Sequence, residues 1–169
     1  MAARLASGGR AGRLRAAIRG PADVALLCRM AGWATLFPLL KHVVSLDRLA
    51  RLAWSDPSDV NGTAIAKVLA LTRVLSLPRS KGSCYERSLL AYRFLARGGH
   101  DPRLVVAVAK RDTAVTAHAW VTVGGRAIGE SDAIKDFAPM VAYGRGGRRE
   151  AVAAASAVPA GADSVIAPP

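Results

Sequence analysis

The sequence predicts an α+β domain in which helices come first and a small antiparallel sheet follows. Before residue 100, apolar residues recur at helical spacing, and no alternation typical of strands appears. After residue 103, runs rich in β-branched residues follow one another across a Gly-Gly turn. The chain has 169 residues, of which 51% are hydrophobic, so it can bury one core but hardly two, because single domains typically hold about 100–150 residues.

Residues 1–20 are expected to form a flexible basic arm. They hold five arginines and no acid, so a good part of the formal net charge of +12 lies at this end. A strongly basic protein usually binds nucleic acid, an anionic membrane surface or an acidic substrate. No interleaving of basic and aromatic residues and no zinc-finger spacing supports the first of these, so we expect no nucleic-acid partner.

Residues 21–57 are expected to form a helical N-terminal segment of one or two helices. The apolar stretch from Ala22 to Leu40 begins it, with a break or kink near Pro38. Asp23, Arg29 and Pro38 interrupt this stretch, and no uninterrupted run reaches the roughly 18–20 residues that span a bilayer. We therefore expect no transmembrane segment, and peripheral contact with a membrane through an interfacial helix is the alternative.

Residues 58–143 are expected to form the core of the domain. A helix should follow the turn at 55–58 and end before Pro78, and a second helix should open at Cys84 and end at Gly98-Gly99. Three strands of a small antiparallel sheet should then follow, with a tight Gly-Gly turn between the last two, at 104–108, 115–123 and 126–130. Residues 144–169 are rich in Gly, Arg, Ala and Pro, a composition that need not fold, so we expect a flexible tail there.

The sequence contains only two cysteines, Cys28 and Cys84, in segments of quite different character. We expect no disulfide framework, and a reducing, cytoplasmic setting is the simpler assumption. Ser83 and Glu86 flank Cys84 in the pattern of a capping box, which places Cys84 on the first residue of a helix. The positive end of the helix dipole stabilises a thiolate there, so Cys84 is a candidate nucleophile. The alternative is a small buried hydrophobe, which is what most free cysteines are.

His118 is the candidate base, because it is the only histidine inside a predicted core strand. A histidine there is costly unless it is hydrogen-bonded, so it is either a satisfied core residue or a catalytic one. We expect His42 and His100 to be structural or solvent-facing. Four metal ligands at zinc-like spacing cannot be assembled from these residues, so we expect no metal and no cofactor.

Glu130 and Asp132 are the candidate acids that would orient the second ring nitrogen of His118. The choice depends on the turn at Gly124-Gly125. With a strict two-residue loop, Ser131 would face His118; with a three-residue loop, Asp132 would lie opposite and Glu130 diagonally on the same face. Spacing alone does not decide between the two acids.

These motifs, taken together, resemble a known family. The resemblance covers about residues 65–135 and rests on three runs in order, 84–90, 98–108 and 118–121, followed by Gly125 and Glu130. They are similar to the B2-type leader peptidases of lasso peptide biosynthesis. The resemblance implies a transglutaminase-like, papain-related cysteine peptidase core, with a Cys-carrying helix packed on a small antiparallel sheet. It also implies a triad in which Cys84 is the nucleophile, His118 the base and Glu130 the acid, although the family more often has Asp at that position, which leaves Asp132 as the alternative.

The resemblance further implies a reaction and partners. The enzyme would remove the leader peptide from a ribosomally made precursor, before a separate ATP-dependent lasso cyclase closes the ring. No nucleotide-binding loop occurs here, so any ATP requirement would belong to the cyclase. In related systems a small β-containing domain holds the leader. Because no strand pattern precedes residue 100, we expect a separate recognition protein of the B1 type as a partner.

Alternatives remain for the docking surface and for the activity. Trp33 and Trp54 of the N-terminal segment are expected as exposed docking residues, and ordinary packing onto the core is the alternative. An acyltransferase or amidase of the same fold would share the Cys-His-acid arrangement. A non-catalytic interaction module, with Cys84 merely packed, is the third alternative.

Overall fold

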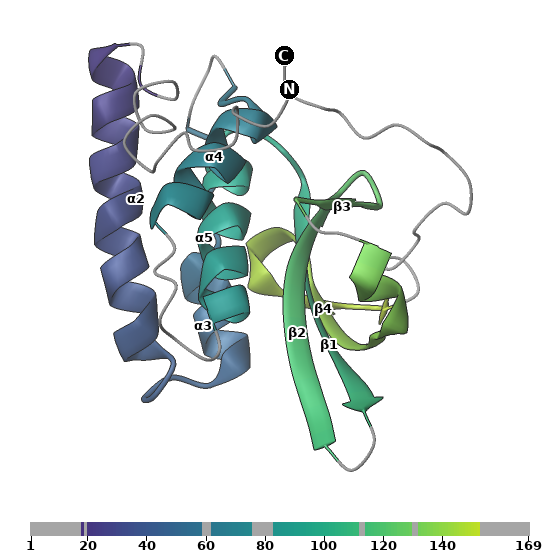
Figure 1. Ribbon diagram of the computed structural model, residues 1–169. Coiled ribbons are helices and arrows are strands. Elements are labelled where there is room, and N and C mark those ends of the chain that lie inside the picture. The colour runs from purple at the N-terminus through teal and green to yellow at the C-terminus, as the bar shows by residue number, and fades with distance from the viewer. Residues whose placement is uncertain are drawn as a thin grey trace, which may run out of the picture.

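The computed structural model describes residue 18 and residues 20–58, 62–75, 83–111, 114–129 and 132–152 (Figure 1). Its helices come first in the chain: α2 (Pro21–Leu40), α3 (Leu46–Ala53), α4 (Ile65–Leu75) and α5 (Ser83–Arg97). Its strands follow: β1 (Pro102–Arg111), β2 (Ala114–Val123), β3 (Arg126–Ile128), β4 (Ala138–Tyr143) and β5 (Arg149–Glu150). Two short 3-10 helices lie between strands: η1 (Asp132–Asp136) and η2 (Arg145–Gly147). The predicted α+β class is confirmed.

The strands form one antiparallel sheet in the order β3-β2-β1-β4-β5. β1 and β2 are its long central pair, matched along their whole length from Pro102 opposite Val123 to Arg111 opposite Ala114. The helices gather on one side of this sheet, with α5 against it and α2 farthest away (Figure 1). η1 lies on the opposite side (Figure 1). The helix that carries Cys84 therefore makes the most extensive contact with the sheet.

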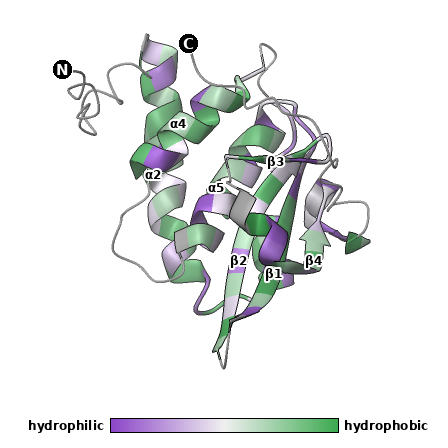
Figure 2. Ribbon diagram, turned by 45° about the vertical axis from the view of Figure 1, so that its right-hand side comes forward, coloured by the Kyte–Doolittle hydropathy of each residue, from purple (hydrophilic) through white to green (hydrophobic). Residues whose placement is uncertain are grey.

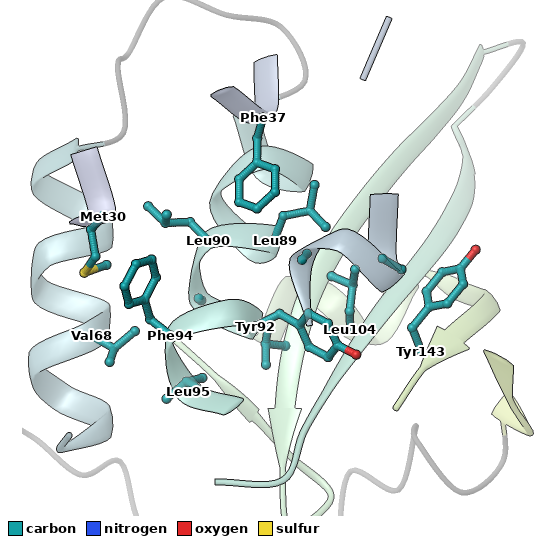
Figure 3. Close-up of a cluster of buried hydrophobic side chains, with 14 of the residues drawn as sticks. Met30, Phe37, Val68, Leu89, Leu90, Tyr92, Phe94, Leu95, Leu104 and Tyr143 are labelled. Carbon is teal, nitrogen blue, oxygen red and sulfur yellow. The ribbon is translucent and has the colours of Figure 1, made fainter. Parts of the chain in front are cut away.

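One hydrophobic cluster joins the N-terminal helices to the rest of the domain (Figure 3). Met30 and Phe37 of α2, Val68 of α4 and Leu89 of α5 are fully buried in it, as is Tyr143 at the end of β4. The apolar residues that recur at helical spacing in the sequence thus pack against one another, as the pattern predicted. The predicted N-terminal segment and the predicted core share a single hydrophobic interior.

Trp33 and Trp54, expected as exposed docking residues, are half-buried. The ring of Trp33 lies 5.2 Å from that of Phe37, and the Arg93 guanidinium carbon lies 3.8 Å from the Trp33 ring centre. The ring of Trp54 lies 5.6 Å from that of Tyr92, and Arg93 donates to the Trp54 carbonyl oxygen at 3.2 Å. Each tryptophan therefore packs much of its apolar surface onto the core. Such packing was the alternative to a role of these residues in docking a partner.

Helix α5 ends where the sequence predicted but begins differently. Gly99 has a φ of +82°, and the amides of Gly98 and Gly99 bond back to the last turn, so the Gly-Gly pair terminates the helix. At the other end, Ser83 is already helical and its side chain lies outside the described residues. The Oε1 of Glu86 accepts a hydrogen bond from Lys41 at 2.5 Å, so a cation just beyond α2 binds the side chain that the sequence assigned to the helix start.

The turn after β2 is the strict two-residue type. Val123 pairs with Arg126, and Gly124 and Gly125 have φ of +58° and +77°, which only glycine adopts readily. The third strand, predicted to run to residue 130, ends at Ile128, because Gly129 has a φ of +73° and turns the chain out of the sheet. The described pairing ends at Val121 opposite Ile128, and Ser131, which this turn would set opposite His118, lies outside the described residues.

Residues 144–150, expected to begin a flexible tail, are structured. The hydroxyl of Tyr92 donates to the Gly144 carbonyl oxygen, and β5 pairs with β4. Gly147 lies so close to α3 that an added Cβ would come within 2.4 Å of the Arg51 Cα. Arg103 of β1 donates to Glu150 at 2.7 Å. The Gly-Arg-rich composition of residues 144–150 did not predict these contacts, because each of them is made with a distant segment of the chain.

Candidate active site

Cys84 lies in the first turn of α5 and is half-buried. The first N–H groups of a helix have no partner within the helix, so this turn presents amide donors and the positive end of the dipole. That placement agrees with the predicted position of the thiol to within one residue. It is also a position at which backbone amides can stabilise a developing oxyanion.

A hydrogen bond from Ser88 holds α5 against β2 beside His118. The Ser88 hydroxyl donates to the carbonyl oxygen of Ala119 at 2.8 Å, and Ser88 is only 4% exposed. Among the described residues, β3 pairs with β2 only over 121–123, so this carbonyl lies beyond the end of β3 and α5 supplies its partner. Ser88 is one helical turn after Cys84 on the same face, and Ala119 is next to His118. The bond therefore brings the helix of the candidate nucleophile against the strand of the candidate base.

The ring of His118 lies on the sheet face that carries Trp120. It is half-buried, 5.3 Å from the ring of Phe137 and 6.0 Å from that of Trp120, and its strand partner in β1 is Ala107. His118 makes a further interaction besides these ring contacts. The hydrogen bonds between described residues do not include one that joins Cys84 to His118. Catalytic hydrogen bonds are often long in ligand-free enzymes and shorten when substrate binds.

The two candidate acids fall at the margin of what the structure describes. Glu130 lies outside the described residues, and of Asp132 only the backbone, at the start of η1, is described. After η1 the chain returns to the His118 face, because Ile134 and Phe137 pack there. The choice between Glu130 and Asp132 stays a prediction.

Two tyrosines that no sequence motif indicated, Tyr85 directly after Cys84 in the chain and Tyr143 at the end of β4, have raised pKa values. Tyr143 donates to Asp47 at 2.6 Å, and Arg149 donates to the same carboxylate at 2.7 Å. These hydrogen bonds hold the pKa of Asp47 below its usual range, while burial raises the pKa of Tyr143 to about 12, with a further contribution from Asp47. The hydroxyl of Tyr85 is buried without a hydrogen-bond partner among the described residues, and burial raises its pKa.

A depression opens beside the Ser88 side of α5. It encloses about 390 Å³, including space open to solvent, between α4, α5, β2 and the end of β3. Arg73 and Arg87 line it together with apolar residues that include Leu69 and Val121. Guanidinium groups bind carbonyl and carboxylate oxygens.

The other histidines have the structural roles that were expected. His42 is exposed, and the Nε2 of His100 lies 2.9 Å from the Thr63 carbonyl oxygen. Among the residues described here, no cluster of three or more His, Cys, Asp or Glu side chains is placed to hold a metal ion.

A protein-family model described as the transglutaminase-like superfamily matches residues 24–142, which is more than half of the chain. The match begins inside α2 and ends in β4, so it includes the N-terminal helices as well as Cys84 and His118. No curated protein and no solved structure matches the chain.

Proposed function

Because the chain belongs to the transglutaminase-like superfamily, we propose that it is a cysteine peptidase in which Cys84 attacks a peptide carbonyl and His118 acts as the base. Cysteine peptidase-like proteins occur in this superfamily. One observation carries the proposal. The hydrogen bond from Ser88 to Ala119 ties α5, the helix of Cys84, to β2, the strand of His118, next to His118 itself, and this supports pairing the two residues.

Each group has a defined part in this chemistry. His118 takes the proton of the Cys84 thiol, and the thiolate forms a bond to the scissile carbonyl carbon. Amides at the start of α5 receive the oxyanion. The intermediate collapses as His118 returns the proton to the leaving amine, which departs and leaves a thioester on Cys84. Water, deprotonated by His118, then attacks the thioester and releases the carboxylic acid and the free thiol.

For the substrate we propose a ribosomally made lasso peptide precursor, from which the enzyme removes the leader. This step rests on the similarity of the motifs around Cys84 and His118 to B2-type leader peptidases. The new amino terminus would pass to an ATP-dependent lasso cyclase in the cytoplasm. The part of the chain that the structure describes holds no strand ahead of α5, so we assign leader recognition to a separate B1-type protein.

The test is cleavage of a leader-core precursor by the purified protein together with its recognition partner, read by mass spectrometry. Cys84→Ala should abolish the leader-sized fragment. Cys28→Ala is the matched control, because it removes the other, exposed thiol and should leave cleavage intact.

Two other outcomes would contradict the proposal. Intact precursor with every variant, although the partner binds the leader, would favour an interaction module. A product heavier by an added amine, and lost in Cys84→Ala, would identify an acyltransferase of the same fold.

A further inference from the structure

Helix α2 is apolar on the face that it turns away from the core. Its buried positions, Asp23, Met30 and Phe37, recur every seven residues and fix the inward side. The exposed positions opposite them are mostly apolar or small: Pro21, Val24, Ala25, Cys28, Gly32, Thr35, Leu36 and Leu39. We call these eight residues the outer face of α2. The one hydroxyl on this face, of Thr35, donates to the carbonyl oxygen of Gly32 at 2.8 Å and is therefore satisfied within the helix.

The one acid of α2 lies on the side opposite to the usual one. A surface helix normally turns its acids to water and its apolar side chains inward. Asp23 is the only acid of α2, yet it is 9% exposed and pairs with Lys67 at 2.6 Å. Leu39, on the outer face, is 68% exposed. Water is thus a poor solvent for this face.

Exposed apolar side chains are concentrated here rather than spread over the molecule. Seven large hydrophobic residues of the described chain are exposed, and four of them lie on α2 or in the turn that follows it: Val24, Leu36, Leu39 and Val43. Val43, at 80%, is the most exposed of the seven. Figure 2 shows hydrophobic residues along much of α2. Exposed apolar side chains that gather on one helix in this way mark a binding surface.

The charge beside the patch indicates what covers it. Arg29 is exposed at the border of the outer face, and the twenty residues up to the start of α2 contain five arginines and no acid. The whole chain carries a formal charge of +12. An apolar stripe next to a cationic segment is complementary to an anionic lipid surface, whose headgroups attract the cations while its acyl chains accept the stripe.

The contacts of the inward side indicate how the helix lies. By length and composition α2 could cross a bilayer, a property that core helices and signal sequences share. Here, however, Met30 and Phe37 belong to the main hydrophobic cluster, and Asp23 is tied to Lys67 of α4. A helix attached to the domain along one side can lie in the membrane surface with its other side.

We propose that the outer face of α2, with Val43, binds an anionic membrane surface, so that the helix lies flat in the interface and the domain stays on the aqueous side. This binding does not depend on the proposed peptidase activity. It assigns a role to a set of side chains that neither the hydrophobic core nor the candidate active site uses.

Vesicle co-sedimentation of the full chain tests the proposal. Binding is expected to vesicles that contain phosphatidylglycerol and to fall with added salt, and vesicles of phosphatidylcholine alone should bind far less. The double variant Leu36→Glu/Leu39→Glu should bind at least about tenfold more weakly. Val115→Glu/Met140→Glu is the matched control, because these large apolar side chains are also exposed but lie elsewhere, and it should bind as the native chain does. Thermal melting confirms that both variants are folded.

A probe on Cys28 reports directly on the outer face of α2, because Cys28 is exposed on that face. The variant Cys84→Ser leaves Cys28 as the only cysteine in the chain. An environment-sensitive fluorophore on Cys28 should shift to shorter wavelength on addition of anionic vesicles. Equal vesicle binding by the Leu36/Leu39 variant would overturn the proposal, since the basic arm alone would then account for it. So would a fluorophore that responds to a recognition protein or to higher protein concentration but not to vesicles. Retention in native-host membranes after alkaline carbonate extraction would instead indicate a spanning helix.

Discussion

Helices α2 and α5 are both rich in apolar residues, but the protein surrounds only one of them. Helix α5 lies between the other helices and the sheet, and buried residues follow one another from Ser88 to Leu95 except at Arg93. Helix α2 packs against the described residues only through its inward side, and Leu39 on its outer face is 68% exposed. Composition therefore does not tell which helix is central. The difference comes from the elements available on each side, and it separates the helix that carries Cys84 from one whose outer side no described residue covers.

The largest expected effect is on stability, and it compares one buried and one exposed side chain. Phe94→Ala in α5 should lower the free energy of unfolding by about 3–5 kcal/mol, because it leaves a cavity in the main core. Leu39→Ala in α2 should change it by no more than about 0.5 kcal/mol. Urea denaturation measures both. A large cost for Leu39→Ala would show that another segment covers the outer face of α2 in solution.

A smaller effect is expected at the contact between α5 and β2. Ser88→Ala should cost about 1–2 kcal/mol, because the buried carbonyl oxygen of Ala119 loses its partner. On the proposed function Ser88 positions the Cys84 helix against the His118 strand, so kcat for peptide cleavage should fall while KM changes little. Ser45→Ala is a suitable control, since the exposed Ser45 precedes α3 without a side-chain capping bond. Equal effects of both variants on kcat would remove Ser88 from the catalytic arrangement.

The two cysteines extend the comparison from stability to reactivity. Iodoacetamide should modify Cys84 about tenfold faster than Cys28, although Cys28 is the more exposed, because the proposed base His118 would activate the Cys84 thiol and no such partner is proposed for Cys28. Peptide mass mapping follows both sites in one sample. In urea the two rates should become equal. Faster modification of Cys28 in the folded protein would favour the packed-thiol alternative for Cys84.

The smallest effect concerns Asp47, where α3 meets the end of the sheet. Its pKa is lowered from 3.8 by hydrogen bonds from Arg149 and Tyr143, so its ionised form stabilises the folded protein above that pH and the contribution is lost as the pH falls. Asp47→Asn should therefore lower Tm slightly at neutral pH, and the difference should close in acid. Melting curves at several pH values test this, with Asp56→Asn as an exposed control. A difference that grew toward acidic pH would contradict the assigned sign.

Several features were determined by the sequence alone, because their causes lie within a few neighbouring residues. The α+β order, the start of a helix beside Cys84, its end at Gly98-Gly99 and the turn at Gly124-Gly125 were all predicted and are all present. Periodicity, a helix-terminating glycine and a two-residue turn act over one or two turns of chain. Cys84 and His118 were recognisable as candidates for the same reason, because the motif around each lies within a few neighbouring residues.

Only the tertiary structure decided the features that depend on a distant partner. Lys41 takes the carboxylate of Glu86, Gly129 ends β3 before the residues that would have faced His118, and Tyr92 anchors the chain at Gly144. The hydrogen bond from Ser88 to Ala119 joins residues 31 positions apart, so no pattern in either segment predicts it. Which side of α2 faces the core was likewise open, because a helix that is apolar all round has no preferred inward side until Met30, Phe37 and the Asp23–Lys67 pair orient it.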